Sequence, residues 1–319
     1  MQKQQQVCRS LSSGKLAPFL PGARFALIIL AGAALMAGGC GERADRDYVR
    51  EVTQWHAERL ERLRSEDGWL TLIGLFPLSA GDHTLGAAAD ADLRLAADVP
   101  PVIGTLSVRP DEVRWTTAAG AAVTVAGSQE PPPPVLAADR DGEPTVLQVG
   151  TVRFHVIARG DLLFLRVKDS ASEVRRTFRG IDRYPVDTRW RVTATLRTRN
   201  QPRTVPMPNV LGQIETLPTP GVLTFEFDGY QHNLIPIAEP GEPLFIVFGD
   251  LTNSQTTYGG GRFLYADPPG PDGTVVLDFN RAYNPPCVFT PYATCLQPLP
   301  ENQMPAAVTA GEKMWGPAH

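Results

Sequence analysis

The feature that most constrains the fold is a long series of strand-length segments separated by turn residues. In most of these segments apolar and polar side chains alternate, so that one face of each strand can be buried and the other exposed. The 30 prolines and 29 glycines are spread along the chain, which favours many turns and short strands over disorder. The sequence therefore predicts a mainly β protein.

The predicted strands form two groups, on either side of a link at residues 171–188. Frequent short strands in the first group are typical of a β-sandwich. Four consecutive prolines, Pro131 to Pro134, predict an extended loop inside this group. The strands of the first group are expected at 69–76, 92–95, 105–108, 113–116, 122–125, 145–149, 152–157 and 162–167.

The second group predicts an antiparallel β-sandwich or a barrel. Asp228-Gly229 separates two of its strands and is the strongest short signal for a hairpin. The segment Leu244–Phe248 is apolar throughout, which suits a strand buried on both faces. The strands of this group are expected at 190–197, 222–227, 231–237, 244–248, 262–265 and 274–279.

One helix is predicted before the strands, from Tyr48 to Glu66. Its apolar positions recur at three- and four-residue spacing among charged residues, which is the pattern of a half-buried helix. Asp45 or Asp47 could cap its start, and Asp67-Gly68 would end it. The expected organisation is a tether and helix at 40–66, a β domain at 67–170 and a second β domain at 171–319.

Residues 1–39 have the features of a secretory signal peptide. A basic segment precedes the apolar run Phe25–Ala37, which has 13 residues, whereas a spanning helix needs about 20. Small residues then lead directly into Cys40, as in a lipobox. We therefore expect an exported bacterial lipoprotein whose lipid is carried on Cys40. An uncleaved anchor is the alternative.

The expected location is the cell envelope, facing the periplasm, with the membrane as a partner through the lipid. Gly41 follows the modified cysteine where an aspartate would favour retention, so in a Gram-negative host the outer membrane is favoured. Without its signal the chain has 26 basic and 34 acidic residues and no Lys/Arg block. This balance disfavours a nucleic-acid partner.

Two cysteines remain once Cys8 leaves with the signal and Cys40 carries the lipid. They are Cys287 and Cys295, and an oxidising compartment allows them to form a disulfide. Closing so short a loop would stabilise the fold by about 2–3 kcal/mol. The alternative is a nucleophilic Cys287 assisted by His232, which requires a lowered thiol pKa and a nearby base.

Polar residues are concentrated in the second half of the chain. Asp250 ends an apolar strand, and Asp278 and Asn280 are two residues apart on one strand face. Carboxylates beside guanidiniums and tyrosines can bind a small polar ligand or transfer protons. The same groups can form a structural hydrogen-bond network. The other candidates are Tyr258, Arg262, Arg281, Tyr283 and Asn284.

Several other chemistries lack a sequence pattern. The five histidines are isolated, so no metal site and no cofactor are expected. No Gly-x-Ser-x-Gly motif of a serine hydrolase occurs. The glycines of Tyr258–Arg262 precede a strand and not a helix, which predicts a bulge or tight turn and no phosphate loop. A two-carboxylate glycosidase would rest only on the presence of Asp250 and Asp278.

Five segments of the second half form a distinctive pattern: Asp250–Asn253, Thr257–Leu264, Leu277–Cys287, Phe289–Cys295 and Glu301-Asn302. This pattern resembles the signature of the domain of unknown function (DUF) 1684 family, and the resemblance extends from about residue 55 to residue 313. The family name leaves its activity open. The resemblance therefore implies expectations about fold and site and not about a reaction.

Four segments of the first half also form a pattern: Gly81–Gly86, Ala91–Leu95, Gly104–Ser107 and Val123–Gly127. This pattern resembles the outline of a forkhead-associated (FHA) sandwich. Such domains bind phosphothreonine through an arginine after the first glycine motif and a Ser-x-x-His turn. Here Ala87 occupies the first position, and no histidine follows Ser107. The resemblance therefore implies an FHA-like scaffold without phosphopeptide binding.

Three functional hypotheses follow. The leading one is a non-enzymatic envelope lipoprotein that binds a small polar ligand or an envelope partner through its C-terminal domain. A hydrolase-like enzyme using Asp250, Asp278 or Cys287 is the alternative, and a purely structural envelope protein is the third. A pocket where Asp250, Arg262, Asp278 and Arg281 converge would favour a ligand or catalysis. Their burial in mutual hydrogen bonds would favour structure.

Overall fold

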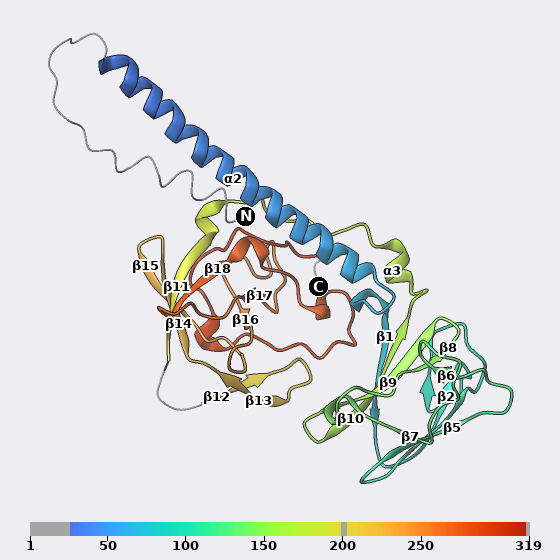
Figure 1. The fold of residues 1–319 in the computed structure, drawn as a ribbon. Coiled ribbons are helices and arrows are strands. Elements are labelled where there is room, and N and C mark those ends of the chain that lie inside the picture. The colour runs from blue at the N-terminus through green and yellow to red at the C-terminus, as the bar shows by residue number, and fades with distance from the viewer. Residues whose placement is uncertain (1–25, 199–202, 317–319) are drawn as a thin grey trace. The chain divides into compact units, whose positions relative to one another are not determined.

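A computed structural model describes residues 26–198 and 203–316, with one long helix followed by many short strands (Figure 1). The prediction of a mainly β protein is confirmed. The chain divides into two compact units, Met1–Arg50 and Glu51–His319. The four hydrophobic clusters found in the described residues all lie within Glu51–His319. This unit therefore contains its own cores.

The helix α2 runs from Ala26 to Arg64, so the predicted helix at 48–66 forms its C-terminal part. Val52 and Leu63 are buried as the apolar spacing requires. The tether and the caps predicted near residues 41–47 are wrong, because those residues are helical. No proline interrupts the chain from 26 to 64, and a glycine inside a helix costs only about 1 kcal/mol.

Part of the predicted signal peptide, residues 1–25, lies outside the described residues. In the described part of the chain, no helix combines the length and apolar character needed to cross a membrane.

The first group of strands forms two five-stranded sheets, as predicted for a sandwich. Their strand orders are β1-β10-β9-β8-β6 and β3-β2-β4-β5-β7. Side chains from both sheets, among them Leu85, Leu106 and Phe154, form one buried cluster. The resemblance to FHA domains stays a prediction. The strands are β1 (Leu72–Leu78), β2 (Gly81–Gly86), β3 (Leu93–Arg94), β4 (Gly104–Val108), β5 (Val113–Thr117), β6 (Thr124–Val125), β7 (Val135–Leu136), β8 (Leu147–Val149), β9 (Val152–Arg159) and β10 (Leu162–Asp169).

The second group forms a four-stranded sheet, β15-β14-β11-β18, and the two-stranded ribbons β12–β13 and β16–β17. No sheet among the described strands closes on itself, so these sheets pack as layers and not as a barrel. No sheet mixes strands from the two sides of residue 170. The strands are β11 (Arg191–Arg197), β12 (Arg203–Pro208), β13 (Ile214–Thr219), β14 (Val222–Phe227), β15 (Tyr230–Leu234), β16 (Leu244–Phe248), β17 (Arg262–Ala266) and β18 (Thr274–Asp278).

The predicted hairpin at Asp228-Gly229 joins β14 to β15. Both residues have positive φ, 51° and 79°, as a two-residue type I′ turn requires. The ribbon β12–β13 was not predicted. Its strands contain Pro206, Pro208 and Pro218, and a proline lowers the strand signal because it cannot donate a hydrogen bond to a neighbouring strand.

The ribbon β16–β17 is buried on both faces, as predicted for residues 244–248. Leu244, Ile246 and Phe248 belong to the core shared with the four-stranded sheet. Phe245, Val247 and Phe263 belong to a second cluster, which also contains Cys287, Ala293 and Cys295. Alternation along each strand thus directs one set of side chains toward the sheet and the other toward the loop at residues 283–296.

Candidate functional site

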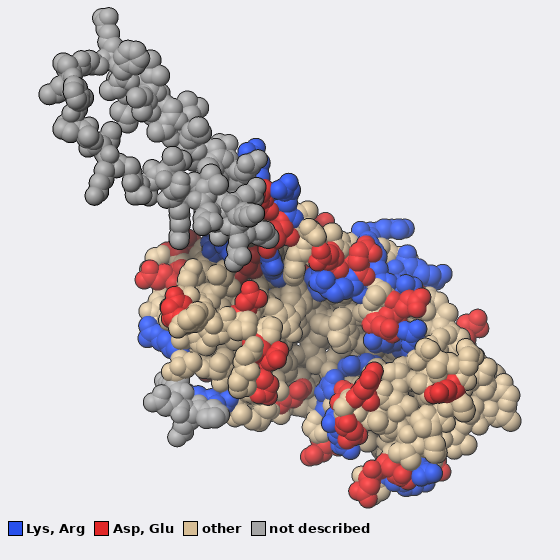
Figure 2. Space-filling view, viewed as in Figure 1, with Lys and Arg blue, Asp and Glu red and all other residues tan. Residues whose placement is uncertain are grey.

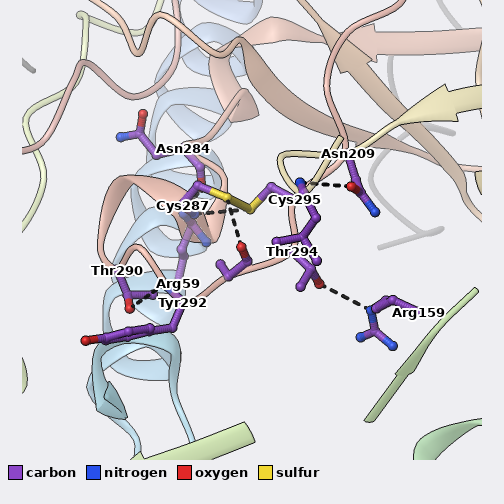
Figure 3. Close-up of a disulfide and its surroundings, with 11 residues drawn as sticks. Arg59, Arg159, Asn209, Asn284, Cys287, Thr290, Tyr292, Thr294 and Cys295 are labelled. Atoms are coloured by element: carbon purple, nitrogen blue, oxygen red, sulfur yellow. Dashed lines mark hydrogen bonds between the residues drawn. A yellow bond between two sulfur atoms is a disulfide. The ribbon is translucent and has the colours of Figure 1, made fainter. Parts of the chain in front are cut away.

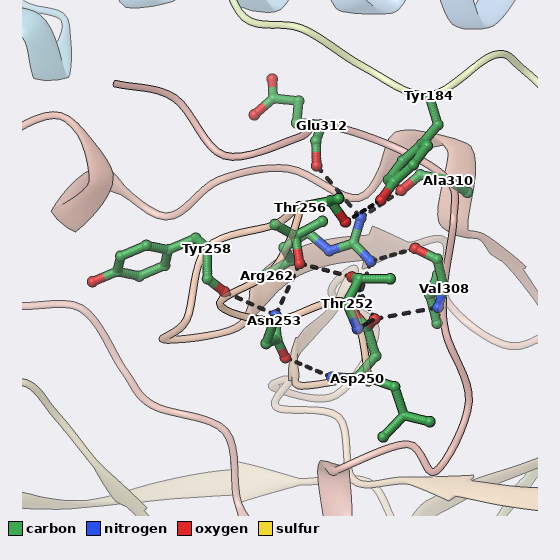
Figure 4. Close-up of polar contacts among 12 residues, drawn as sticks. Tyr184, Asp250, Thr252, Asn253, Thr256, Tyr258, Arg262, Val308, Ala310 and Glu312 are labelled. Carbon is green, nitrogen blue, oxygen red and sulfur yellow. Dashed lines mark hydrogen bonds and ion pairs between the residues drawn. The ribbon is translucent and has the colours of Figure 1, made fainter. Parts of the chain in front are cut away.

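The first predicted site residues, Asp250 and Arg262, form a fully buried ion pair. The side chains have no exposed surface, and Arg262 Nη2 lies 2.8 Å from Asp250 Oδ2. The same nitrogen donates to the carbonyl oxygen of Val308 at 2.8 Å, and Nη1 donates to that of Ala310. Figure 4 shows the guanidinium surrounded by these partners. Arg262 therefore holds the segment 308–312 against β17.

The other carboxylate oxygen of Asp250, Oδ1, accepts three hydrogen bonds. It accepts hydrogen bonds from the Thr252 hydroxyl at 2.6 Å, the Thr252 amide at 2.8 Å and the Val308 amide at 3.2 Å. Asn253 donates from its amide nitrogen to the Tyr258 carbonyl at 2.8 Å, which ties the loop together. Neither Asp250 nor Arg262 lines any of the three cavities described below. This network is structural.

The end of β18 is joined to the link at residues 171–188 and to α2 by three polar residues, Asp278, Asn280 and Arg281. Asn280 donates to the Asp187 carbonyl at 2.8 Å and accepts from the Asp187 amide at 3.0 Å. Arg281 Nε lies 3.3 Å from Asp278 Oδ2, and its Nη2 donates to Glu51 of α2. These three predicted site residues therefore connect elements of the fold, and they line none of the three cavities described below.

Tyr283 and Asn284 lie at the other side of the loop, against α2. Arg59 of α2 is 4.3 Å from the centroid of the Tyr283 ring, and its Nε donates to Glu312 at 2.6 Å. The buried Glu312 carboxylate also accepts from the Asn284 amide at 2.8 Å. Burial is the main cause that raises the pKa of Tyr283 well above its usual range. The Tyr283 hydroxyl is therefore a neutral group at pH 7.

The predicted disulfide between Cys287 and Cys295 is present, with Cα atoms 6.2 Å apart. The disulfide closes the loop at residues 287–295. Within this loop, Thr294 accepts a hydrogen bond from Arg159 Nε of β9 at 3.2 Å (Figure 3). The alternative of a nucleophilic Cys287 is wrong, because its sulfur is bonded. His232, its proposed base, is buried on β15 and stacks on Phe225.

Two adjoining cavities lie where this loop meets the first sandwich, and we call them together the aromatic groove. They share Trp69, Phe245, Phe263 and Pro286 as lining residues. The first has a volume of about 290 Å³, and the second about 200 Å³. Further lining residues are Arg159, Arg166, Glu215, Ala293, Thr294, Cys295 and Leu296 in the first cavity, and Arg59, Leu63, Tyr265, Tyr283, Asn284 and Phe289 in the second.

The groove has a continuous aromatic floor. The ring centroids of Phe245 and Phe263 are 4.9 Å apart, and Phe245 is also 4.9 Å from Tyr265. Tyr283 extends the row, 5.8 Å from Phe263. The face in Figure 2 is hollowed between the two β-rich parts, and charged side chains border the hollow. The site thus combines a broad apolar surface with a few charged groups, as small-molecule sites do.

Arg166 is the unusual charged group of the groove. It lies on β10 with an exposed fraction of 8%, and its Nε and Nη2 have no hydrogen-bond partner. Its guanidinium is 5.5 Å from the centroid of the Trp69 ring. Burial, and then the nearby Arg159, lower the pKa of Arg166 to about 10, so the side chain is still charged at pH 7. Arg159 differs, since it pairs with Asp139 at 2.8 Å.

A third cavity of about 720 Å³ lies on the first sandwich and is lined by Asp67, Arg153, His155 and Lys168 among others. Its basic groups have partners. Arg153 pairs with the Asp67 carboxylate at 2.7 Å, and Lys168 donates to the Asp67 carbonyl at 2.7 Å. The groove is therefore the better candidate site, although it is smaller.

The sequence did not predict the groove residues Trp69, Arg159, Arg166, Phe245 and Phe263. Four of them stand in predicted strands. Three of these, Trp69, Phe245 and Phe263, are aromatic, and aromatic residues in strands ordinarily indicate core. Arg166 carries the one available signal, since it interrupts the apolar segment Leu162–Val167. An arginine inside a buried strand requires a partner or a function.

We predict that Asp250→Asn lowers the free energy of unfolding by about 3–5 kcal/mol, because it leaves Arg262 buried without its counter-charge. Denaturant unfolding of the soluble fragment Gly41–His319, which includes the unit Glu51–His319, measures this. The double variant Asp250→Leu/Arg262→Met should recover part of the loss. Arg114→Met, which breaks an exposed pair with Glu112, is the control and should cost less than about 1 kcal/mol. Unchanged stability of Asp250→Asn would contradict a structural role.

We also predict a pH effect from His155. Burial, together with Arg166 and Lys168, lowers the pKa of His155 to about 4. Between about pH 6.5 and pH 4 the unfolded chain therefore binds more protons at this residue than the folded chain. Stability should fall by about 1–3 kcal/mol as the pH drops through this window. His155→Gln should show a flatter profile in the same measurement, and a profile identical to that of the wild type would refute the effect.

Comparisons with known proteins bear on the second half of the chain. Residues 176–313 match the family described as "Protein of unknown function (DUF1684)". The chain is also 31% identical to an uncharacterized protein of Haloarcula marismortui, solved by solution NMR, over 44% of this chain and 78% of that one, with a TM-score of 0.37. No curated protein matches the chain.

The predicted resemblance is thus confirmed for the second half, and its extension to residue 55 stays a prediction. The matched segment contains the Asp250–Arg262 network and the disulfide loop that forms one wall of the groove. Residues 176–313, which are less than half of the chain, are thus similar to the DUF1684 family.

Proposed function

We propose that this protein is an exported, lipid-anchored envelope protein that binds a small ligand in the aromatic groove. The observation that carries the proposal is the groove itself. Aromatic rings from the β16–β17 ribbon, the disulfide loop and the start of the first sandwich line two adjoining cavities. Ligand sites of proteins commonly combine such apolar walls with a few charged or polar groups.

The walls of the groove are held in place before any ligand arrives. The disulfide pins the loop, and the Thr290 hydroxyl donates to the Leu72 carbonyl of β1 at 3.0 Å. Arg59 fixes the opposite end through Glu312. A site with prearranged walls loses little conformational freedom on binding, which favours affinity. We therefore expect the ligand to enter without a large rearrangement of the backbone.

The two alternative functions have less support. A hydrolase using Asp250 or Cys287 would need a free carboxylate or thiol, and both groups are engaged. Asp278 is bound to Asn280 and Arg281. A purely structural protein would account for these networks but not for an apolar groove that contains an unpaired arginine.

The lipid anchor rests on the sequence. A basic segment, a short apolar run and small residues before Cys40 are the features that support it. The anchor would keep the ligand site at the membrane surface, facing the periplasm if the host is Gram-negative. A single acyl chain binds a membrane only weakly, and stable anchoring requires more than one.

We predict that the full chain, expressed in a bacterial host, is recovered from membranes with a lipid-modified N-terminal Cys40. Mass spectrometry of the purified protein checks this. Cys40→Ser should abolish both the lipid and the membrane recovery. Cys8→Ser is the matched control and should leave both unchanged, because Cys8 lies in the proposed signal. Recovery of an unmodified, uncleaved chain from membranes would contradict the proposal and support the uncleaved anchor.

We predict that a compound binding the groove raises the melting temperature of the Gly41–His319 fragment, because it binds only the folded state. The panel should contain sugars, nucleotides, organic acids, alcohols, amines and lipid head groups. Leu296→Trp fills the first cavity and should reduce the affinity about 10-fold or more. Leu251→Trp, at an exposed position outside the groove, is the matched control. Absence of any shift, or equal binding by both variants, would contradict a ligand site in the groove.

A further inference from the structure

The charge of the ligand can be inferred from Arg166, and this inference rests on the proposed function. Arg166 is more than nine-tenths buried and lines the first cavity of the groove. It forms no ion pair with any described residue, and its Nε and Nη2 donate to no protein acceptor. A buried guanidinium without an acceptor is unfavourable, because the desolvation of the charge is not compensated.

The surroundings of Arg166 increase the positive potential of the cavity. Arg159 lies close enough to lower the pKa of Arg166, and both guanidiniums line the same space. Asp139 pairs with Arg159 and accepts a hydrogen bond from the Ala158 amide. Its charge also raises the pKa of Arg166, but the two side chains form no hydrogen bond or ion pair. Glu215 is the one carboxylate that lines the cavity, and it accepts a hydrogen bond from Asn209 Nδ2 at 2.8 Å, outside ion-pair distance of either arginine. The unused donors are therefore those of Arg166.

The groove continues beyond the first cavity along mostly aromatic side chains. Arg59 also lines the second cavity, but its charge is paired with Glu312 at 2.6 Å. Trp69, Phe245 and Phe263 line both cavities, so an apolar body can extend from one into the other. Tyr265 and Tyr283 line the second cavity, and burial raises the pKa values of their hydroxyls above the usual range for tyrosine. These hydroxyls are neutral at pH 7, so they add no anionic group.

We infer that the ligand is an amphipathic anion, whose carboxylate or phosphate head accepts hydrogen bonds from Arg166 while its apolar body lies along Trp69, Phe245 and Phe263. A planar guanidinium donates two parallel hydrogen bonds to either head group. A fatty carboxylate and an alkyl phosphate share this chemistry, and binding measurements separate them. A neutral sugar could accept hydrogen bonds from Arg166 but would not compensate its charge, and a cation would be repelled.

A structural role for Arg166 and a role in ligand binding predict opposite effects of Arg166→Met on the stability of the ligand-free protein. If the contact of its guanidinium with Trp69 mainly stabilised the fold, then Arg166→Met would lower the melting temperature. If Arg166 is kept for a ligand, removal of its unpaired charge should raise the melting temperature of the ligand-free fragment by about 2–5 °C. Stability of the free protein and affinity for the ligand should then change in opposite directions.

The test uses four compounds with the same eight-carbon chain: octanoate, octyl phosphate, octanol and octylamine. Calorimetric titration into the Gly41–His319 fragment, which contains the whole unit Glu51–His319, measures each affinity. At least one of the two anions should bind about 10-fold or more tightly than octanol, and octylamine should bind no better than octanol. The anion with the higher affinity identifies the head group as carboxylate or phosphate.

The variants assign the preference to Arg166. Arg166→Met should lower the affinity for the preferred anion about 10–100-fold, which is the usual contribution of charge-assisted hydrogen bonds, and should leave the affinity for octanol unchanged. Arg166→Lys should retain part of the preference. Arg94→Met is the control, since Arg94 is exposed and lines none of the three cavities described above.

Two failures are distinguishable. If octanol and octylamine bind as well as both anions, and Arg166→Met changes nothing, the inference about charge is wrong while the groove remains a ligand site. If the Leu296→Trp and Leu251→Trp variants bind each compound of the broad panel with the same affinity, the proposed function itself is wrong. It is also wrong if no compound of the panel binds. A lower melting temperature of ligand-free Arg166→Met would also overturn the inference.

Discussion

The ion pair between Asp250 and Arg262 is the interaction on which the second half of the structure depends. It joins the residues that follow β16 and begin β17, and it ties the segment 308–312 to them. The ribbon it closes is buried on both faces. One face completes the core of the four-stranded sheet, and the other supplies the aromatic floor of the groove. A buried pair of this kind stabilises little by itself, but loss of one partner is costly.

The groove differs from the rest of the interior in how its buried charges are paired. Most buried charges are neutralised inside the protein, as Asp250 is by Arg262 and Glu312 is by Arg59. Among the described residues, Arg166 is buried without an ion pair and also lines a cavity with aromatic walls. Folded proteins seldom bury an unpaired charge, because the cost is a sizeable fraction of the total stability. Retention of such a group beside a preformed cavity is the physical basis for assigning a ligand to it.

Much of the fold could be predicted from sequence, because local patterns determine local structure. The continuous apolar run of β16 and the Asp228-Gly229 turn indicated their structures directly. The ribbon β12–β13 was missed because its prolines are atypical of strands. The start of α2 was misplaced because the expected tether contains no residue that stops a helix.

The site was harder to predict than the fold, because its residues are far apart in the sequence. The polar residues selected from the family motif are conspicuous, yet Asp250, Arg262 and Asn280 serve the scaffold. Only tertiary packing brings Trp69, Arg166 and Phe263 to one groove. Whether an arginine is paired depends on such packing, so Arg166 could not be separated from ordinary strand arginines by its sequence position.

The most direct test of the account is a crystal structure of the Gly41–His319 fragment with 8-bromooctanoate. Anomalous scattering locates the bromine, and the electron density locates the carboxylate. The account predicts the carboxylate within hydrogen-bond distance of Arg166 and the bromine in the second cavity, beside Tyr265 and Tyr283. A carboxylate directed away from Arg166, or a bromine outside the groove, would contradict it.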